Sequence, residues 1–127
     1  MIAVVDDDVC VCRAIKRLVW THGIKAETFT SALDFLEMLE AIPSFQPGCV
    51  VLDMHMAGLD GLQVQARLAA MRPRVPVIFL TAVRAGASER RARAAGAVAF
   101  FRKPFDGDLD SFVKTIRTVL ELQHTGE

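Results

Sequence analysis

Short apolar runs alternate with longer helix-like segments along the whole chain. Four of the five runs are strongly apolar and the second is weaker; they span residues 2–5, 25–29, 49–52, 75–80 and 98–102. Apolar runs of this length are typical of strands that are buried on both faces. Strands that alternate with helices form a parallel sheet with helices on both sides and right-handed crossovers. The pattern predicts an α/β fold with a doubly wound five-stranded parallel sheet, (αβ)₅, in one domain over residues 1–127.

The segments between the runs have helical periodicity. Helices are expected over residues 8–22, 62–71, 86–95 and 109–120, and another follows the capping pair Thr30-Ser31 and ends before Pro43. In the first helix the expected buried stripe comprises Val11, Ile15, Leu18, Val19 and His22. That stripe leaves Trp20 toward solvent.

The helix expected over residues 86–95 lacks large apolar side chains. Its sequence, Ser88-Glu89-Arg90-Arg91-Ala92-Arg93-Ala94-Ala95, offers mainly alanine and arginine, so it is expected to dock weakly on the sheet. The arginines, Arg84, Arg90, Arg91 and Arg93, form either a solvated face, which we favour, or a patch for a partner or nucleic acid.

Composition narrows the class of protein. The chain has 127 residues, a formal net charge of zero and 52% hydrophobic residues, which suits one domain with a substantial core. With no net positive charge, neither nucleic acid nor a membrane is an expected partner of this domain. No apolar stretch approaches membrane-spanning length, and the three cysteines lack the even number and spacing typical of a disulfide framework. A cytoplasmic protein with reduced thiols is expected, with Cys49 in the core and no structural zinc.

Polar residues close four of the apolar runs. Asp6, Asp7 and Asp8 follow the first run, and Asp53, Thr81 and Lys103 follow later ones. In an open parallel sheet, ligands bind at the carboxyl ends of the strands. The acids, the hydroxyl and the lysine are therefore expected to meet at one edge.

The motifs at these strand ends match those of a known family in their order and in their residues. The motifs are Val5-Asp6-Asp7-Asp8, Leu52-Asp53-Met54-His55-Met56-Ala57-Gly58-Leu59-Asp60-Gly61, Phe79-Leu80-Thr81-Ala82 and Phe100-Phe101-Arg102-Lys103-Pro104-Phe105. With them the chain resembles, over nearly its whole length, the CheY-like receiver domain of bacterial two-component response regulators. The Lys-Pro-Phe ending is most similar to receivers of the FixJ and NarL kind. Each motif alone is common, but four in order are specific.

The resemblance implies roles for the residues at this edge. Asp53 would accept a phosphoryl group, Asp7 and Asp53 would bind Mg²⁺, Asp6 would hold its water ligands, and the His55 carbonyl would complete the set. Lys103 and Thr81 would contact the phosphoryl oxygens. Such a receiver promotes its own Mg²⁺-dependent phosphorylation and dephosphorylation and is not otherwise an enzyme. From the residues alone, the three acids can also serve only as a helix cap, and for Asp8 the cap is the favoured role.

The resemblance also implies a conformational switch. Thr81 and Phe100 would form the switch pair, although strand alternation alone can make Phe100 an ordinary core residue. The Lys103-Pro104 peptide is expected to be cis, as in the family. His55 and Val83 would flank the path of water to the phosphoryl group, with Val83 shielding it.

The implied partners are proteins. A sensor histidine kinase or a histidine phosphotransfer protein would donate the phosphoryl group, and Trp20 either contacts that partner or lies on its own surface. The fourth helix, fifth strand and fifth helix would contact a downstream effector or output domain, and a phosphorylation-dependent dimer is compatible with the family. The chain is expected to contain no output domain, as a stand-alone regulator, a fragment of a larger regulator or a hybrid-kinase receiver.

Three other classes of protein share part of this pattern. A haloacid-dehalogenase-like phosphatase needs a second acid two residues after its nucleophile, where this chain has His55. A flavodoxin-like nucleotide binder needs a phosphate-cradling loop after the first strand, where three acids stand. A pseudo-receiver that is never phosphorylated is the nearest rival.

The chain departs from the family at one position of the loop after Asp53. Ala57 replaces the proline usual in the family, so this loop gains freedom in φ.

Overall fold

The computed structural model describes residues 1–82, 86–103 and 109–125. The strands are β1 (Ile2–Val5), β2 (Ala26–Phe29), β3 (Cys49–Asp53), β4 (Val77–Thr81) and β5 (Ala99–Arg102). The helices are α1 (Val9–Trp20), α2 (Ala32–Ala41), α3 (Gly61–Met71), α4 (Gly86–Ala94) and α5 (Leu109–Thr125). Strands and helices alternate strictly, as the sequence predicts.

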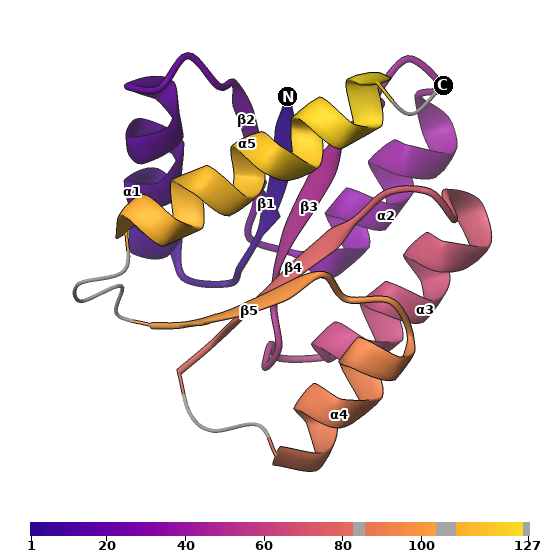
Figure 1. The fold of residues 1–127 in the computed structure, drawn as a ribbon. Helices are drawn as coiled ribbons and strands as arrows, with labels where there is room; N and C mark the ends of the chain where they lie inside the picture. Colours follow the sequence, from indigo (N-terminus) through magenta and orange to yellow (C-terminus); the bar gives the residue numbers. More distant parts are fainter. Residues whose placement is uncertain (83–85, 104–108, 126–127) are drawn as a thin grey trace.

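The five strands form one parallel sheet. Their spatial order is β2-β1-β3-β4-β5, so the chain reverses direction across the sheet after β2. Helices α1 and α5 cover one face, and α2, α3 and α4 cover the other (Figure 1). The predicted doubly wound (αβ)₅ fold is therefore confirmed.

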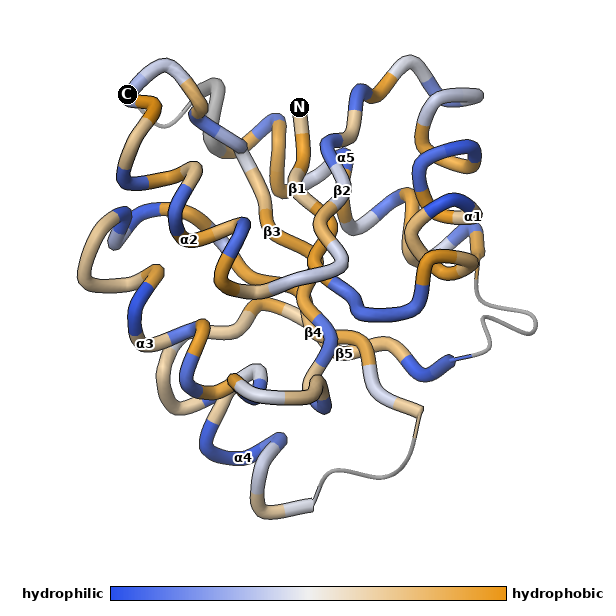
Figure 2. The backbone as a smooth tube through the Cα atoms, turned by 180° about the vertical axis from the view of Figure 1, so that it is seen from behind, coloured by the Kyte–Doolittle hydropathy of each residue, from blue (hydrophilic) through white to orange (hydrophobic). Residues whose placement is uncertain are grey.

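Both faces of the sheet are buried in apolar cores. Strands β1 and β3 are buried at every position, which is why they are runs of apolar residues rather than alternating ones. On the side of α1 and α5, the core is built around Ile15, Ile78, Phe112 and Ile116. On the other side it is built around Phe35, Leu52, Leu68 and Phe79. Figure 2 shows the strands as the most apolar part of the backbone.

Two predicted details of α1 need correction. The helix ends at Trp20, and His22 lies exposed beyond it with Nδ1 3.0 Å from the Leu18 carbonyl oxygen. The predicted burial of Ile15 and Val19 is confirmed, and Val11 and Leu18 are partly buried against the same core. Cys12 joins this face of the helix, whereas His22 does not. Trp20 is 65% exposed, as predicted.

One further bound differs from the sequence prediction. Strand β4 begins at Val77 because the Val75 N–H is bonded to the Arg72 carbonyl in a turn and Pro76 has no N–H. Asp53 and Thr81 are the last residues of β3 and β4, so the prediction that polar residues end these strands is confirmed. Both side chains are therefore fixed by the sheet itself.

Candidate functional site

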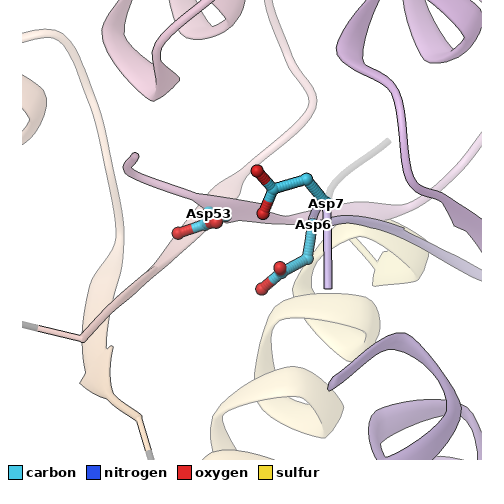
Figure 3. A group of neighbouring side chains, drawn as sticks. All are labelled: Asp6, Asp7 and Asp53. Carbon is cyan, nitrogen blue, oxygen red and sulfur yellow. The ribbon is translucent and has the colours of Figure 1, made fainter. Parts of the chain in front are cut away.

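Three carboxylates meet at the carboxyl end of the sheet. Asp6 follows β1, Asp7 is next to it, and Asp53 ends β3, the neighbour of β1. One ligand atom from each of Asp6, Asp7 and Asp53 lies within 4.8 Å of the others. Figure 3 shows the three carboxylates pointing to the same side of the strand ends. Asp6 and Asp53 are buried, whereas Asp7 is exposed, so the cluster is open to solvent on one side.

Lys103 supplies a positive charge to this cluster. Its Nζ lies 2.9 Å from Asp6 Oδ2 and 3.5 Å from Asp53 Oδ1. Its backbone N–H donates to the Thr81 carbonyl at 2.8 Å, which extends the pairing of β5 with β4 by one residue beyond Arg102. The sheet thus sets the point from which the lysine side chain reaches back to the acids.

Burial and charge change the pKa values of this pair. Burial of Asp53 and the nearby charge of Asp6 raise the pKa of the Asp53 carboxyl, and Lys103 opposes that change only in part. For Lys103, burial lowers the pKa, but the hydrogen bond to Asp6 and the charges of Asp53 and Asp6 outweigh burial, so the pKa is raised. Lys103 therefore remains an ammonium ion at neutral pH.

Asp6 is held in position by three groups besides Lys103. The Asp8 N–H donates to Asp6 Oδ1 at 2.9 Å, and the Asp6 N–H donates to the Phe29 carbonyl at 3.0 Å. The Cys12 thiol donates to the Asp6 carbonyl at 3.3 Å. Burial of Cys12 and the nearby Asp6 raise the thiol pKa to about 11, so the thiol keeps its proton.

Asp8 has the local role predicted for it. It is the N-cap of α1, where its carboxylate accepts from the Cys10 N–H at 2.8 Å and the Val11 N–H at 3.4 Å. An acidic cap also interacts favourably with the positive end of the helix dipole. The three consecutive acids therefore divide into a cap, Asp8, and two cluster members, Asp6 and Asp7.

The remaining predicted residues surround the cluster. Thr81 is 3% exposed at the end of β4, directly beside β3. The exposed His55 donates its backbone N–H to Asp53 Oδ1 at 3.3 Å. Phe100 in β5 is half-buried and stacks on Phe79 with ring centroids 5.2 Å apart. The predictions for Pro104 and its cis peptide, for Val83 and for Arg84 lie outside the described residues.

The chemistry of the donor set fits a hard divalent cation. Three carboxylates and one ammonium group leave a local charge of −2 when all are ionised, from three negative charges and one positive. Carboxylate oxygens are the ligands that Mg²⁺ prefers in proteins. The cluster contains neither a thiol nor an imidazole, the donors that favour zinc.

Two further buried residues make structural hydrogen bonds, Cys12 beside the cluster and Gln65 between α3 and α4. The spacing of Cys12 from Ile15 and Val19 is the sequence signal for its place on the buried side of α1. Gln65 of α3 is 4% exposed and donates its side-chain amide to the Ala92 carbonyl of α4 at 2.9 Å. No local pattern distinguishes such a glutamine from an exposed one.

Comparison with known proteins gives consistent matches over almost the entire chain. The family model of the response regulator receiver domain matches residues 2–117. The response regulator protein TmoT of Ectopseudomonas mendocina is 35% identical over 96% of this chain and 53% of its own length. The transcriptional regulatory protein FixJ of Bradyrhizobium diazoefficiens is 34% identical over 84% of this chain and 51% of its own. This chain spans about half the length of these curated relatives.

Solved structures give the same result. A response regulator receiver protein from Burkholderia phymatum is 48% identical, with a TM-score of 0.84 over 94% of each chain. A CheY-like receiver domain from Methanospirillum hungatei is 21% identical with a TM-score of 0.88, a likeness of fold. Within the parts of the chain that the structure describes, no helix has the length and apolar character needed to cross a membrane.

Proposed function

Because the chain belongs to the response regulator receiver domain family of two-component systems, we propose that Asp53 is its phosphoacceptor. The observation that carries the proposal is the surroundings of Asp53. It ends a fully buried strand, two further carboxylates lie within 4.8 Å, and an ammonium group lies 3.5 Å away. A surface carboxylate with a purely structural role needs none of these neighbours.

The transfer itself is a displacement at phosphorus. An Asp53 carboxylate oxygen forms a bond to the phosphorus of a phosphohistidine while the P–N bond breaks, and the electron pair of that bond returns to the imidazole nitrogen of the donor. The product is an acyl phosphate on Asp53. Burial and the charge of Asp6 raise the pKa of Asp53, but the carboxyl must be ionised to act as a nucleophile.

Neighbouring residues would stabilise the transferred group. Lys103 would place its ammonium against the phosphoryl oxygens, and the Thr81 hydroxyl would donate a hydrogen bond to them. Mg²⁺ bound by Asp7, Asp53 and the His55 carbonyl, with Asp6 holding its water ligands, would neutralise negative charge during the transfer. Asp6 would also keep Lys103 aimed at the acceptor, since the two side chains are hydrogen-bonded.

The donor in this proposal is a sensor histidine kinase or a histidine phosphotransfer protein. The exposed surface of α1 favours a docking role, because Arg13, Lys16 and Arg17 are exposed on the same helix as Trp20. Relatives such as FixJ are transcriptional regulators by name and about twice as long, so we propose that this domain signals to an effector or output domain. The surface for that contact would be formed by α4, β5 and α5.

Mass spectrometry of intact protein tests the acceptor assignment. Wild-type protein incubated with acetyl phosphate and Mg²⁺ should gain the mass of one phosphoryl group, and Asp53→Asn should gain none. Asp8→Asn is the matched control, because asparagine caps a helix as well as aspartate does and the fold is retained. A wild-type protein that stays unmodified would make the chain a pseudo-receiver, and full labelling of Asp53→Asn would move the acceptor elsewhere.

A further inference from the structure

The peptide group between Asp6 and Asp7 joins two members of the carboxylate cluster. Figure 3 shows their side chains leaving neighbouring backbone positions in different directions, with both carboxylates on the side of Asp53. A peptide group is planar, so rotation of its carbonyl turns the backbone of both residues and moves both carboxylates. The relative placement of Asp6 and Asp7 therefore depends on what holds this carbonyl.

The sheet does not hold the Asp6 carbonyl. Strand β1 ends at Val5, and the Asp6 N–H makes one further bond toward β2, to the Phe29 carbonyl at 3.0 Å. Phe29 is the last residue of β2, so the ladder between the two strands stops there. Among the residues that the structure describes, the Cys12 thiol is the only group that donates to the Asp6 carbonyl, at 3.3 Å. The thiol thus takes the place of the next N–H in the ladder.

Helix α1 fixes the direction from which the thiol approaches. Cys12 is 3% exposed and lies on the same buried face of α1 as Ile15 and Val19. Its backbone N–H donates to the Asp8 carbonyl at 3.1 Å, and the Asp8 N–H donates to Asp6 Oδ1 at 2.9 Å. One residue of α1 therefore holds both ends of the loop from Asp6 to Asp8.

The thiol is the donor in this contact. Burial and the charge of Asp6 raise the pKa of Cys12 to about 11, so the thiol keeps its proton at neutral pH. Its Sγ also lies 3.9 Å from the Phe29 carbonyl, a longer contact. An S–H group is a weak donor, but its removal would leave a buried carbonyl without a partner, which is unfavourable. The Asp6 carbonyl is then expected to turn toward water at the open side of the cluster.

We infer that Cys12 is a positioning residue for the carboxylate cluster, because its thiol holds the peptide between Asp6 and Asp7 in the orientation that places both carboxylates beside Asp53. The inference rests on the proposed function for the role of the cluster. Asp6 also accepts a hydrogen bond from Lys103, so the thiol supports the placement of that charge as well. Loss of the thiol donor should weaken Mg²⁺ binding, since the two carboxylates lose their relative placement.

Three substitutions separate the donor at position 12 from the size of the side chain. Cys12→Ala has a smaller side chain and Cys12→Val a larger one, and neither has a donor, whereas Cys12→Ser keeps a donor. Titration calorimetry should give an Mg²⁺ Kd about fivefold higher than wild type for Cys12→Ala and Cys12→Val. The Kd of Cys12→Ser should stay within about twofold of wild type.

Stability should follow a different order. Cys12 lies in an apolar core, where cysteine behaves as a small hydrophobic residue. Cys12→Val keeps that apolar character, so it should melt above Cys12→Ser, which buries a hydroxyl. A residue with a purely structural role would instead give the tighter Mg²⁺ binding to the more stable variant.

Amide hydrogen exchange in EDTA tests the positioning without metal or phosphate. The N–H groups of Asp6 and Asp8 are bonded at the strand end that the thiol supports, whereas the Ile2 N–H is bonded to the Lys25 carbonyl at the other end of β1. In Cys12→Ala and Cys12→Val, exchange at Asp6 and Asp8 should accelerate about fivefold more than exchange at Ile2. In Cys12→Ser the ratio of these rates should match that of wild type.

Cys49 provides the matched control. It is 0% exposed, lies in the same apolar core as Cys12, and begins β3 at the end of the strand opposite to Asp53. Cys49→Val and Cys49→Ser make the same chemical changes away from the cluster. They should change the melting temperature and leave both the Mg²⁺ Kd and the ratio of exchange rates unchanged.

Wild-type Mg²⁺ affinity and exchange ratios in Cys12→Ala and Cys12→Val would overturn the inference. A Cys12→Ser variant as impaired as Cys12→Val would also overturn it, because affinity would then not depend on the donor. Failure of acetyl phosphate to label the wild type would refute the proposed function alone, since exchange at Asp6 and Asp8 in EDTA still decides the role of the thiol.

Discussion

Lys103 donates a hydrogen bond of 2.9 Å to Asp6, a residue 97 positions earlier in the chain. The lysine is thus bonded to the carboxylate beside the proposed acceptor and stands 3.5 Å from the acceptor itself. Asp6 is fully buried, so the pair is shielded from solvent more than an exposed ion pair would be. The Lys103 ammonium group therefore makes its short hydrogen bond to Asp6 and not to Asp53. It still lies close enough to Asp53 to contact a group bound there.

Replacing Asp53 with asparagine is expected to stabilise the metal-free protein at neutral pH. The pKa of Asp53 is raised by burial and by Asp6, so the folded state binds its proton more tightly than the unfolded state does. The stability that this provides is present below the unfolded pKa and is lost as the pH rises through the folded pKa. The Tm of Asp53→Asn should therefore exceed that of the wild type by an amount that grows from acid to neutral pH. At neutral pH the difference should reach a few degrees, which corresponds to about 1 kcal/mol in the free energy of unfolding.

Thermal unfolding in EDTA between acid and neutral pH measures this difference. Glu37→Gln, which removes an exposed carboxylate from α2, is the matched control and should have little effect. If Asp53→Asn melted below wild type at neutral pH, the surroundings of Asp53 would stabilise its ionised carboxylate, which contradicts the prediction.

Mg²⁺ is expected to raise the melting temperature of the wild type. The three clustered carboxylates repel one another, and a cation that binds only the folded state stabilises it by about 1.4 kcal/mol when its free concentration is about ten times Kd. Asp7→Asn should reduce the gain, and it is a safe substitution because Asp7 is exposed. Lys103→Met should increase the gain, because it changes the local charge from −2 to −3. A wild-type melting temperature that is the same with and without millimolar Mg²⁺ would be evidence against a cation site at these carboxylates.

The sequence was sufficient for the fold because each level of the pattern agreed. The apolar runs and the capping pair Thr30-Ser31, in which Ser31 is the N-cap of α2, indicate the same alternation of strands and helices. The errors lie at ends of elements. His22 continued the helical spacing but lies beyond Trp20, and Val75 continued the apolar run but belongs to a turn.

The site was predictable only in part. Residues at the ends of parallel strands must share an edge, so the convergence of Asp6, Asp7, Asp53 and Lys103 followed from topology. Which carboxylate Lys103 would contact did not follow, because a distance of a few ångströms depends on the packing of the whole sheet. The bond from Gln65 to Ala92 was also unpredictable, since it links helices whose relative position no local pattern encodes.

Amide exchange in α4 is expected to be faster than in α5. The described part of α5 buries Phe112, Val113, Ile116 and Val119, whereas α4 buries only Ala92. Local opening therefore costs α4 less apolar contact. Equal protection factors for the two helices under native conditions would contradict this account of α4.

Thiol reactivity is expected to distinguish the three cysteines. Burial and Asp6 raise the pKa of Cys12 to about 11, and burial raises that of Cys49 to about 12, whereas Cys10 is exposed. Thiolate is the reactive form, so a thiol reagent at neutral pH should modify Cys10 in the native protein and all three cysteines after unfolding. Rapid modification of Cys12 in the native state, located by peptide mass mapping, would show that the region behind Asp6 is open.

Reduction of the phosphorylated protein with borohydride tests the central claim most directly. Borohydride converts an aspartyl phosphate to homoserine, and peptide mass mapping then identifies the residue. Protein treated with acetyl phosphate and Mg²⁺ is predicted to carry homoserine at position 53 and to retain aspartate at positions 6, 7 and 8. Homoserine at one of those three positions, or none at position 53 in protein that has gained a phosphoryl group, would contradict the assignment of Asp53 as the phosphoacceptor.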